Sequence, residues 1–348
     1  MTPAQNLSTP LRLLLGLAAL VIVAGGIQAA QSIVVPFLLS VFIAIICEPP
    51  LTFLQRRGMP VWLALLAVIG GVVAVLLAAG ALLGDSVAAF SSALPFYEKR
   101  LGEQGAHFIA WLGGLGLQLN ADDILKYLDP AAAVKLVGRF VNSLGGVLAN
   151  AFLIFLTVIF ILLEAARFPA KLAAIVQVPG ASLAPLRECM ENINRYLAIK
   201  TLTSLATGAG VSAGLALAGV DFALLWGMLA FFLNYIPAIG SFIAAAPAIL
   251  LALVQLGPGG AVAALAVFLI VNIVIGNFVE PHLMGKSLGL STLVVFLSLV
   301  FWGWLLGPVG MFLSAPLTMV TRIALDASRE TRWLGILLSA DAPPPGRR

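Results

Sequence analysis

Charged residues are scarce in this sequence. Asp, Glu, Lys and Arg make up 10% of its 348 residues, whereas hydrophobic residues make up 61%. A soluble domain has about 25% charged and about 45–50% apolar residues. Because no soluble core needs so much apolar surface, lipid must solvate most of it. The composition predicts a polytopic membrane protein. We attribute the net charge of +4 to cytoplasmic loops rather than to a nucleic-acid partner.

Cysteine and histidine are also scarce, with two residues of each type. Cys47 and Cys189 form no disulfide framework, and we place both on the reducing cytoplasmic side, so we expect no bridge between them. His282 lies near Glu280, but no second His or Cys is close in the sequence, which argues against a metal site. We therefore expect neither a metal nor a cofactor.

Two short motifs of soluble enzymes occur in the chain without the context that they need. The run from Gly210 to Gly214 matches Gly-x-Ser-x-Gly, but it lies inside an apolar helix instead of a strand–turn–helix elbow. A small-residue face for helix packing explains these glycines better. Residues 285–287 read Gly-Lys-Ser, but position 280, where a phosphate loop needs glycine, is Glu280. We expect no enzyme and no ATP site.

Apolar runs of a length that spans a bilayer as a helix recur along the chain. A spanning helix needs about 20 residues, and the alternation expected of barrel strands is not seen. The fold class is therefore an all-α membrane protein with about six full transmembrane helices. The six runs are Leu13–Ala30, Ile33–Cys47, Val61–Gly84, Leu144–Leu163, Thr201–Val220 and Ala261–Phe278.

Two further apolar segments are each broken near the middle. The first covers residues 222–256 and breaks at Asn234–Gly240, and the second covers residues 290–325 and breaks at Gly307–Gly310. A helix of such length would measure roughly 52 Å, which is too long for one ordinary span. Each segment is either two short tilted spans or a re-entrant hairpin, and both leave its ends on one side. The two hairpins then form an inverted pair.

Basic residues predict the orientation. With both termini in the cytoplasm, the short outside loops contain no Lys or Arg, as the positive-inside rule requires. Five basic residues lie in one long outside segment, which is exempt from the rule. These five are Lys99, Arg100, Lys126, Lys135 and Arg139. The other fourteen are Arg12, Arg56, Arg57, Arg167, Lys171, Arg187, Arg195, Lys200, Lys286, Arg322, Arg329, Arg332, Arg347 and Arg348.

The pattern divides the chain into five regions. The outside segment is amphipathic, with expected helix starts at Asn120–Asp123 and Asp129–Pro130. Another helix is expected to begin at Pro185 and to continue through Lys200 into the fifth span. The regions are 1–84 (three transmembrane helices), 85–143 (the extracytoplasmic amphipathic segment), 144–220 (two transmembrane helices and a cytoplasmic connecting helix), 221–325 (the hairpin and transport region) and 326–348 (the cytoplasmic tail).

Paired broken helices are the strongest indication of a transport site in a membrane chain. A break frees backbone groups that lipid cannot satisfy, so they must face protein or a water-filled cavity. The alternative is that the asparagines only hold helices together, at about 0.6–2 kcal/mol per contact. The candidate substrate-binding and gating residues are Asn234, Tyr235, Pro237, Gly240, Ser241, Asn272, Asn277, Glu280, Pro281, Gly307, Pro308, Gly310 and Pro316.

No Asp, Glu, Lys or Arg is expected in the middle of a span. The carboxylates Glu48, Glu164, Asp221 and Glu280 all lie near span ends. Because a buried carboxylate relay is the usual mark of proton coupling, we expect a neutral substrate, or coupling through an interfacial group such as Glu280.

Several runs of the last third resemble the AI-2E (autoinducer-2 exporter) family. They are Asn234–Ser241, Gly276–Lys286, Leu288–Phe296, Phe301–Gly310 and Ser314–Leu317. The resemblance implies a bacterial inner-membrane exporter of small molecules, autoinducer-2 in the best-known members, that assembles as a homopentamer and moves its hairpin region like an elevator. Ala238 departs from the polar or bulkier residue that relatives often have there, so we expect a different substrate specificity if that side chain contacts the substrate.

These observations lead to three hypotheses. The first is a secondary transporter that exports a small polar molecule, autoinducer-2 being the candidate that the resemblance implies. The second is a sodium or other cation/proton antiporter of the same family. The third is a channel, which would show unitary currents or unsaturable flux in liposomes, where a transporter would saturate.

Overall fold

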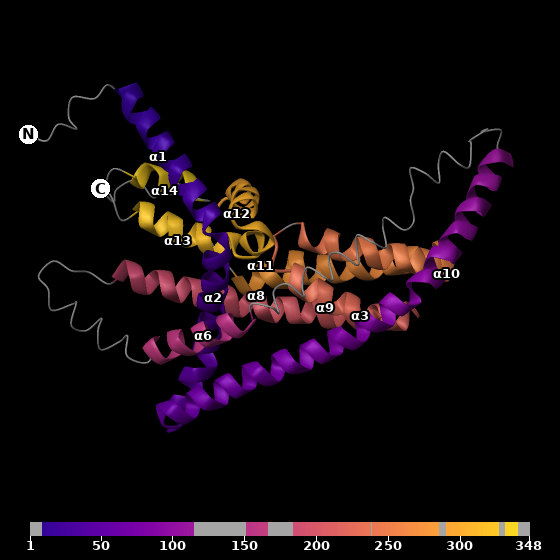
Figure 1. Cartoon of the computed structure of the whole chain (residues 1–348), viewed down its shortest axis with the longest axis horizontal. Helices are drawn as coiled ribbons and strands as arrows, with labels where there is room; N and C mark the ends of the chain where they lie inside the picture. The colour runs from indigo at the N-terminus through magenta and orange to yellow at the C-terminus, as the bar shows by residue number, and fades with distance from the viewer. Residues whose placement is uncertain are drawn as a thin grey trace, which may run out of the picture.

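The computed structural model describes residues 9–114, 151–165, 184–237, 239–284, 290–326 and 331–339. These ranges are helical apart from short turns and one isolated β-bridge between Leu290 and Ser339 (Figure 1). Within these described ranges, four stretches are long and apolar enough to cross a membrane: Gln31–Arg56, Val61–Tyr97, Gly240–Met284 and Thr292–Phe312. Large apolar side chains are widely exposed, with Ile22 at 74% and Leu217 at 91%. The prediction of an all-α polytopic membrane protein is confirmed.

The N-terminal part consists of long helices. The predicted span Val61–Gly84 continues without interruption into the segment expected outside the membrane, because the glycines near residue 84 lower helix stability only slightly. The helix starts predicted at Asn120–Asp123 and Asp129–Pro130 lie outside the described residues. The helices of this part are α1 (Thr9–Ala29), α2 (Gln31–Arg56), α3 (Val61–Gly114) and α6 (Ala151–Ala165).

Helix α8 (Ala184–Leu217) confirms the helix predicted from Pro185 into the fifth span. The chain reverses after it and returns as α9 (Ala223–Leu233). Close packing of α8 on α9 depends on glycine, since a Cβ on Gly208 would lie 2.8 Å from the Gly227 carbonyl oxygen. Two other glycines of α8, Gly210 and Gly214, face valines of α10 as the predicted packing surface.

The first broken segment is a helical hairpin. After α9 the chain turns at residues 234–237 and 239 and continues as α10 (Gly240–Val271). Gln255 accepts a hydrogen bond from the Asp221 backbone N–H at 2.8 Å and donates one to the Gly219 carbonyl at 3.0 Å. The two ends of the segment therefore lie together, as both sequence alternatives required.

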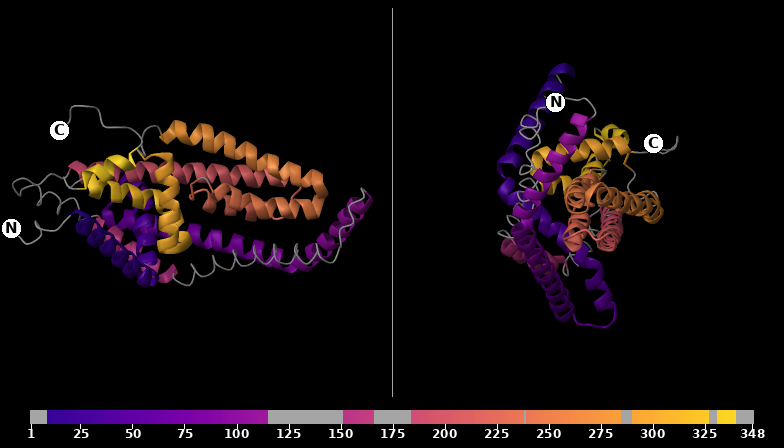
Figure 2. Two further views of the ribbon diagram at one scale, coloured as in Figure 1. Left: turned by 90° about the horizontal axis from the view of Figure 1, so that it is seen from above. Right: turned by 90° about the vertical axis from the view of Figure 1, so that its right-hand side faces the viewer.

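A second reversal lies within α10, at Gly257, whose φ of 77° only glycine adopts readily. The returning half runs back beside the first, and Ser241 and Asn272 meet across the two (Figure 2). The sequence predicted one regular helix over Ala261–Phe278. The chain stays helical but changes to π winding in η2 (Asn272–Val279) and then continues as α11 (Glu280–Met284). Hydrophobic periodicity does not distinguish these two windings.

The second broken segment has its break where the sequence placed it. Helix α12 (Thr292–Phe312) departs from helical geometry at Gly307, with φ 67° and ψ −154°. The chain folds back there, since a Cβ on Gly310 would overlap the Trp302 carbonyl. Helices α13 (Ser314–Asp326) and α14 (Arg332–Leu338) follow.

Candidate transport site

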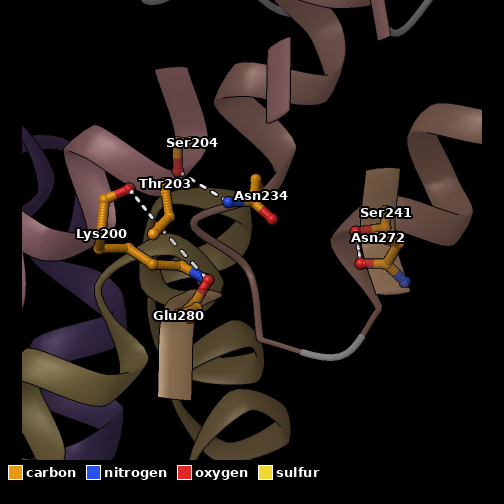
Figure 3. A network of polar contacts seen from close by, with 7 residues as sticks. All are labelled: Lys200, Thr203, Ser204, Asn234, Ser241, Asn272 and Glu280. Carbon is orange, nitrogen blue, oxygen red and sulfur yellow. Dashed lines mark hydrogen bonds and ion pairs between the residues drawn. The ribbon is translucent and has the colours of Figure 1, made fainter. Parts of the chain in front are cut away.

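The tip of the first hairpin packs against the middle of α8. Asn234, which is 8% exposed, donates a hydrogen bond from Nδ2 to the Ser204 Oγ at 3.0 Å (Figure 3). The Tyr235 hydroxyl donates to the Thr201 Oγ1 at 2.8 Å. Gly240 has no room for a side chain, because a Cβ there would overlap the Leu233 carbonyl. The tip therefore depends on these residue types for its position.

The two hairpin breaks approach each other through aromatic rings. The ring centroids of Tyr235 and Phe312 lie 4.5 Å apart, and both rings also contact Phe42 of α2. Tyr235 belongs to the first break, and Phe312 closely follows the second. The structure thus brings the two breaks together around a cluster of aromatic side chains, of which Tyr235 and Phe42 are buried and Phe312 is half-buried.

Helix α8 presents a buried polar stripe to the hairpin. Lys200, Thr203, Ser204 and Thr207 follow the i, i+3, i+4, i+7 spacing of one helix face, and none is more than 6% exposed. None of these residues was selected from the sequence as a site residue. The signal was available in the spacing of their polar side chains at the start of an apolar run.

An ion pair lies at one end of the stripe. The Lys200 Nζ is 2.7 Å from the Glu280 Oε1, and the Thr203 Oγ1 is within hydrogen-bonding distance of the Glu280 Oε2 at 3.3 Å. The side chains of Lys200 and Glu280 are 7% and 17% exposed. The charge count placed Lys200 on the cytoplasmic side, within the helix predicted from Pro185 into the fifth span, and Glu280 near a span end. The structure has Lys200 within α8 and pairs it with Glu280, a contact that was not predicted from the sequence.

A small pocket lies beside Asn272, at the end of the stripe formed by Thr207. The Ser241 Oγ donates a hydrogen bond to the Asn272 Oδ1 at 3.1 Å. This bond joins the first half of α10 to the start of η2. The unfilled space measures about 210 Å³ including its open mouth, and its enclosed part has room for about one water molecule. The lining residues are Thr207, Val211, Ala230, Ser241, Phe268, Val271 and Asn272.

Other predicted residues lie away from this pocket. Asn277, Pro281 and Pro308 are exposed, and Pro237 is half-buried in the turn. Gly307 faces Gln31 of α2, and Pro316 is buried at the start of α13. Ala238 lies outside the described residues. Within the described ranges, no group of three or more His, Cys, Asp or Glu side chains is placed to hold a metal ion.

Helices that expose apolar surface, paired hairpins and a buried polar cluster are together the features of a membrane transport protein. The chain belongs to the AI-2E transporter family, whose model, described as "AI-2E family transporter", matches residues 17–330. Family membership and the apolar helices make it a multi-pass transporter of the bacterial inner membrane.

Two curated relatives from Escherichia coli (strain K12) are similar over nearly the whole chain. One is "AI-2 transport protein TqsA", 40% identical over 329 residues, which cover 94% of this chain and 96% of that protein. The other is "Putative transport protein YhhT", 40% identical over 345 residues, which cover 98% of each chain.

Proposed function

We propose that this protein is a secondary transporter that exports a small polar molecule, and that autoinducer-2 is its first candidate substrate. The observation that carries the proposal is the pocket in which Ser241 of the hairpin meets Asn272 of the returning helix. The name of the TqsA relative supports the choice of substrate.

The chemistry of the pocket favours a neutral, hydroxylated solute. Its polar lining consists of the hydroxyls of Thr207 and Ser241 and the amide of Asn272, and none of its lining residues is charged. Hydroxyl and amide groups can both donate and accept hydrogen bonds, which suits a substrate rich in hydroxyl and carbonyl oxygens.

The pocket is closed to such a solute in the observed arrangement, because it has room for about one water molecule. Ligand pockets typically measure about 300–1,000 Å³. Movement of the hairpin relative to α8 would enlarge the space, and this is the change expected of alternating access. A continuously open pore is the less favoured alternative for the same reason.

Cation/proton antiport remains a second candidate function, and the Lys200–Glu280 pair favours its proton-binding step, because the carboxylate can bind a proton. Sodium added to everted vesicles would cause proton movement if the protein were an antiporter. Absence of that movement would remove this candidate.

The decisive experiment measures autoinducer-2 outside a strain from which the gene has been deleted, with and without a plasmid copy. We expect less external signal in the deletion strain and recovery with the wild-type gene. A Ser241→Ala/Asn272→Ala variant that reaches the membrane should recover less signal. Equal external signal in the deletion and complemented strains would contradict autoinducer-2 as the substrate.

A further inference from the structure

We propose that Lys200 and Glu280 form the proton-coupling site of this transporter, an inference that rests on the proposed function. Their ion pair is short, with Lys200 buried and Glu280 17% exposed, and it joins α8 to α11 across 80 residues of sequence. Ionisable side chains inside membrane proteins are rare and usually mark an ion or proton pathway. Neither Lys200 nor Glu280 lines the neutral pocket, so binding of a neutral solute there does not explain the ion pair.

Among the described residues, few charged or titratable groups surround Glu280. Helix α11 packs against α8 and η2. Helix α8 contributes Lys200 and Tyr196, and the latter interacts electrostatically with Glu280. η2 contains no titratable residue, and His282 on the same helix as Glu280 is exposed. Binding of a proton to the Glu280 carboxylate therefore mainly removes its attraction to Lys200.

The coupling step is the binding of one proton by Glu280. An O–H bond forms at a carboxylate oxygen, the carboxyl group becomes neutral, and the site gains one positive charge. Lys200 then lacks its counter-ion in a buried place, which strongly disfavours the closed arrangement. The ammonium group beside the carboxylate also repels a metal cation, so a proton suits this site better than sodium.

The π-helix connects this site to the pocket. Asn272, which lines the pocket, is the first residue of η2, and Glu280 directly follows its last residue. Because π winding has more residues per turn than α winding, a change between them would rotate Asn272 relative to Glu280. π-bulges occur frequently at functional sites. Release of the ion pair can thereby alter the contact between Asn272 and Ser241.

The test uses the full-length protein in liposomes that contain a pH-sensitive dye, with autoinducer-2 as the probe. Wild-type protein is expected to exchange labelled for unlabelled autoinducer-2 and to move protons when an autoinducer-2 gradient is imposed. Glu280→Gln should abolish the proton movement, and any exchange that it retains should no longer vary with pH. Asp326→Asn makes the same chemical change in an exposed ion pair with Arg322, and should leave proton movement at the wild-type level.

Glu280→Gln alone leaves Lys200 unpaired, so the double variant Lys200→Met/Glu280→Gln is measured beside it. Exchange without proton movement in the folded double variant would support the proposal. Proton movement at the wild-type level in either variant would overturn it, as would loss of all exchange in both variants while both remain folded. Absence of exchange in the wild-type protein would instead overturn the proposed substrate, and the coupling inference with it.

Discussion

Lys200 and Glu280 neutralise each other where neither charge would be stable alone. Thr203 adds no charge to the pair. Its hydroxyl donates a hydrogen bond to the second carboxylate oxygen of Glu280. A buried pair of this kind contributes little net stability compared with apolar residues, whereas loss of one partner is costly. The free energy of unfolding of Lys200 and Glu280 variants therefore shows whether the remaining charge is buried.

We predict that Lys200→Met lowers the free energy of unfolding by about 3–5 kcal/mol, because it leaves a buried carboxylate unpaired. The double variant Lys200→Met/Glu280→Gln should recover most of this loss, since neither residual side chain is charged. Denaturation of the purified proteins in detergent measures both. Additive losses in the double variant would show that the two side chains do not interact.

Asn234 and Pro237 hold the tip of the first hairpin. Asn234→Ala removes the donor to Ser204, at a cost of about 0.6–2 kcal/mol, and Pro237→Ala relaxes the turn. We expect both variants to reach the membrane and to transport less autoinducer-2 than the wild type. Ser92→Ala, which removes only an exposed hydrogen bond to its own helix, is the control. Wild-type transport by both tip variants would exclude the tip from the site.

At the scale of elements, the hairpins depend on glycines at their closest approaches. Gly240 lies over the Leu233 carbonyl and Gly310 over the Trp302 carbonyl, so an added Cβ would overlap backbone atoms in each hairpin. Backbone cannot move aside as a flexible side chain does, and each overlap must shift a whole helix.

We therefore predict that Gly240→Ala and Gly310→Ala each reduce the yield of folded protein and its melting temperature. Gly259→Ala is the matched control, because a Cβ there would meet nothing within 4 Å. The measurement is size-exclusion chromatography of the detergent-solubilised protein followed by a thermal melt. Stability of the two hairpin variants equal to that of Gly259→Ala would contradict the close packing.

At the scale of the whole molecule, α8, α9, α10, η2 and α11 form one antiparallel bundle around the pocket. α9 returns antiparallel to α8, and the first half of α10 reverses again. The second half of α10 then comes back beside α8 and continues into η2 and α11 (Figure 2). A solute larger than water can enter only if these helices separate or the hairpin moves.

A disulfide between α8 and the returning half of α10 tests this requirement. A Cβ on Gly214 would lie 3.4 Å from the Val267 Cβ, which is close to the roughly 3.5–4.5 Å of a disulfide. In a background of Cys47→Ala and Cys189→Ala, we expect oxidised Gly214→Cys/Val267→Cys protein to stop transporting and reduction to restore it. Val267→Cys alone, which leaves Gly214 unchanged, is the control. Undiminished transport by the cross-linked protein would mean that these helices move together.

The Ser241 and Asn272 half of the candidate site could be predicted from the sequence. Ser241 and Asn272 were selected separately from their polarity within apolar runs, and the structure brings them into hydrogen-bonding distance. Lys200 and the threonines of α8 were missed because polar residues near a span end are normally solvated. Asn277 and Pro281, selected in the same way as Asn272, are exposed.

By itself, the sequence determined the membrane class, the positions of the two breaks and the antiparallel path of the first hairpin. These follow from local properties, namely the length of apolar runs and the effect of glycine and proline on helical backbone. Only the tertiary structure decided that Lys200 meets Glu280 and that η2 winds as a π-helix. Such contacts depend on the rotation of each helix about its axis, which is set by packing against neighbours far away in the chain.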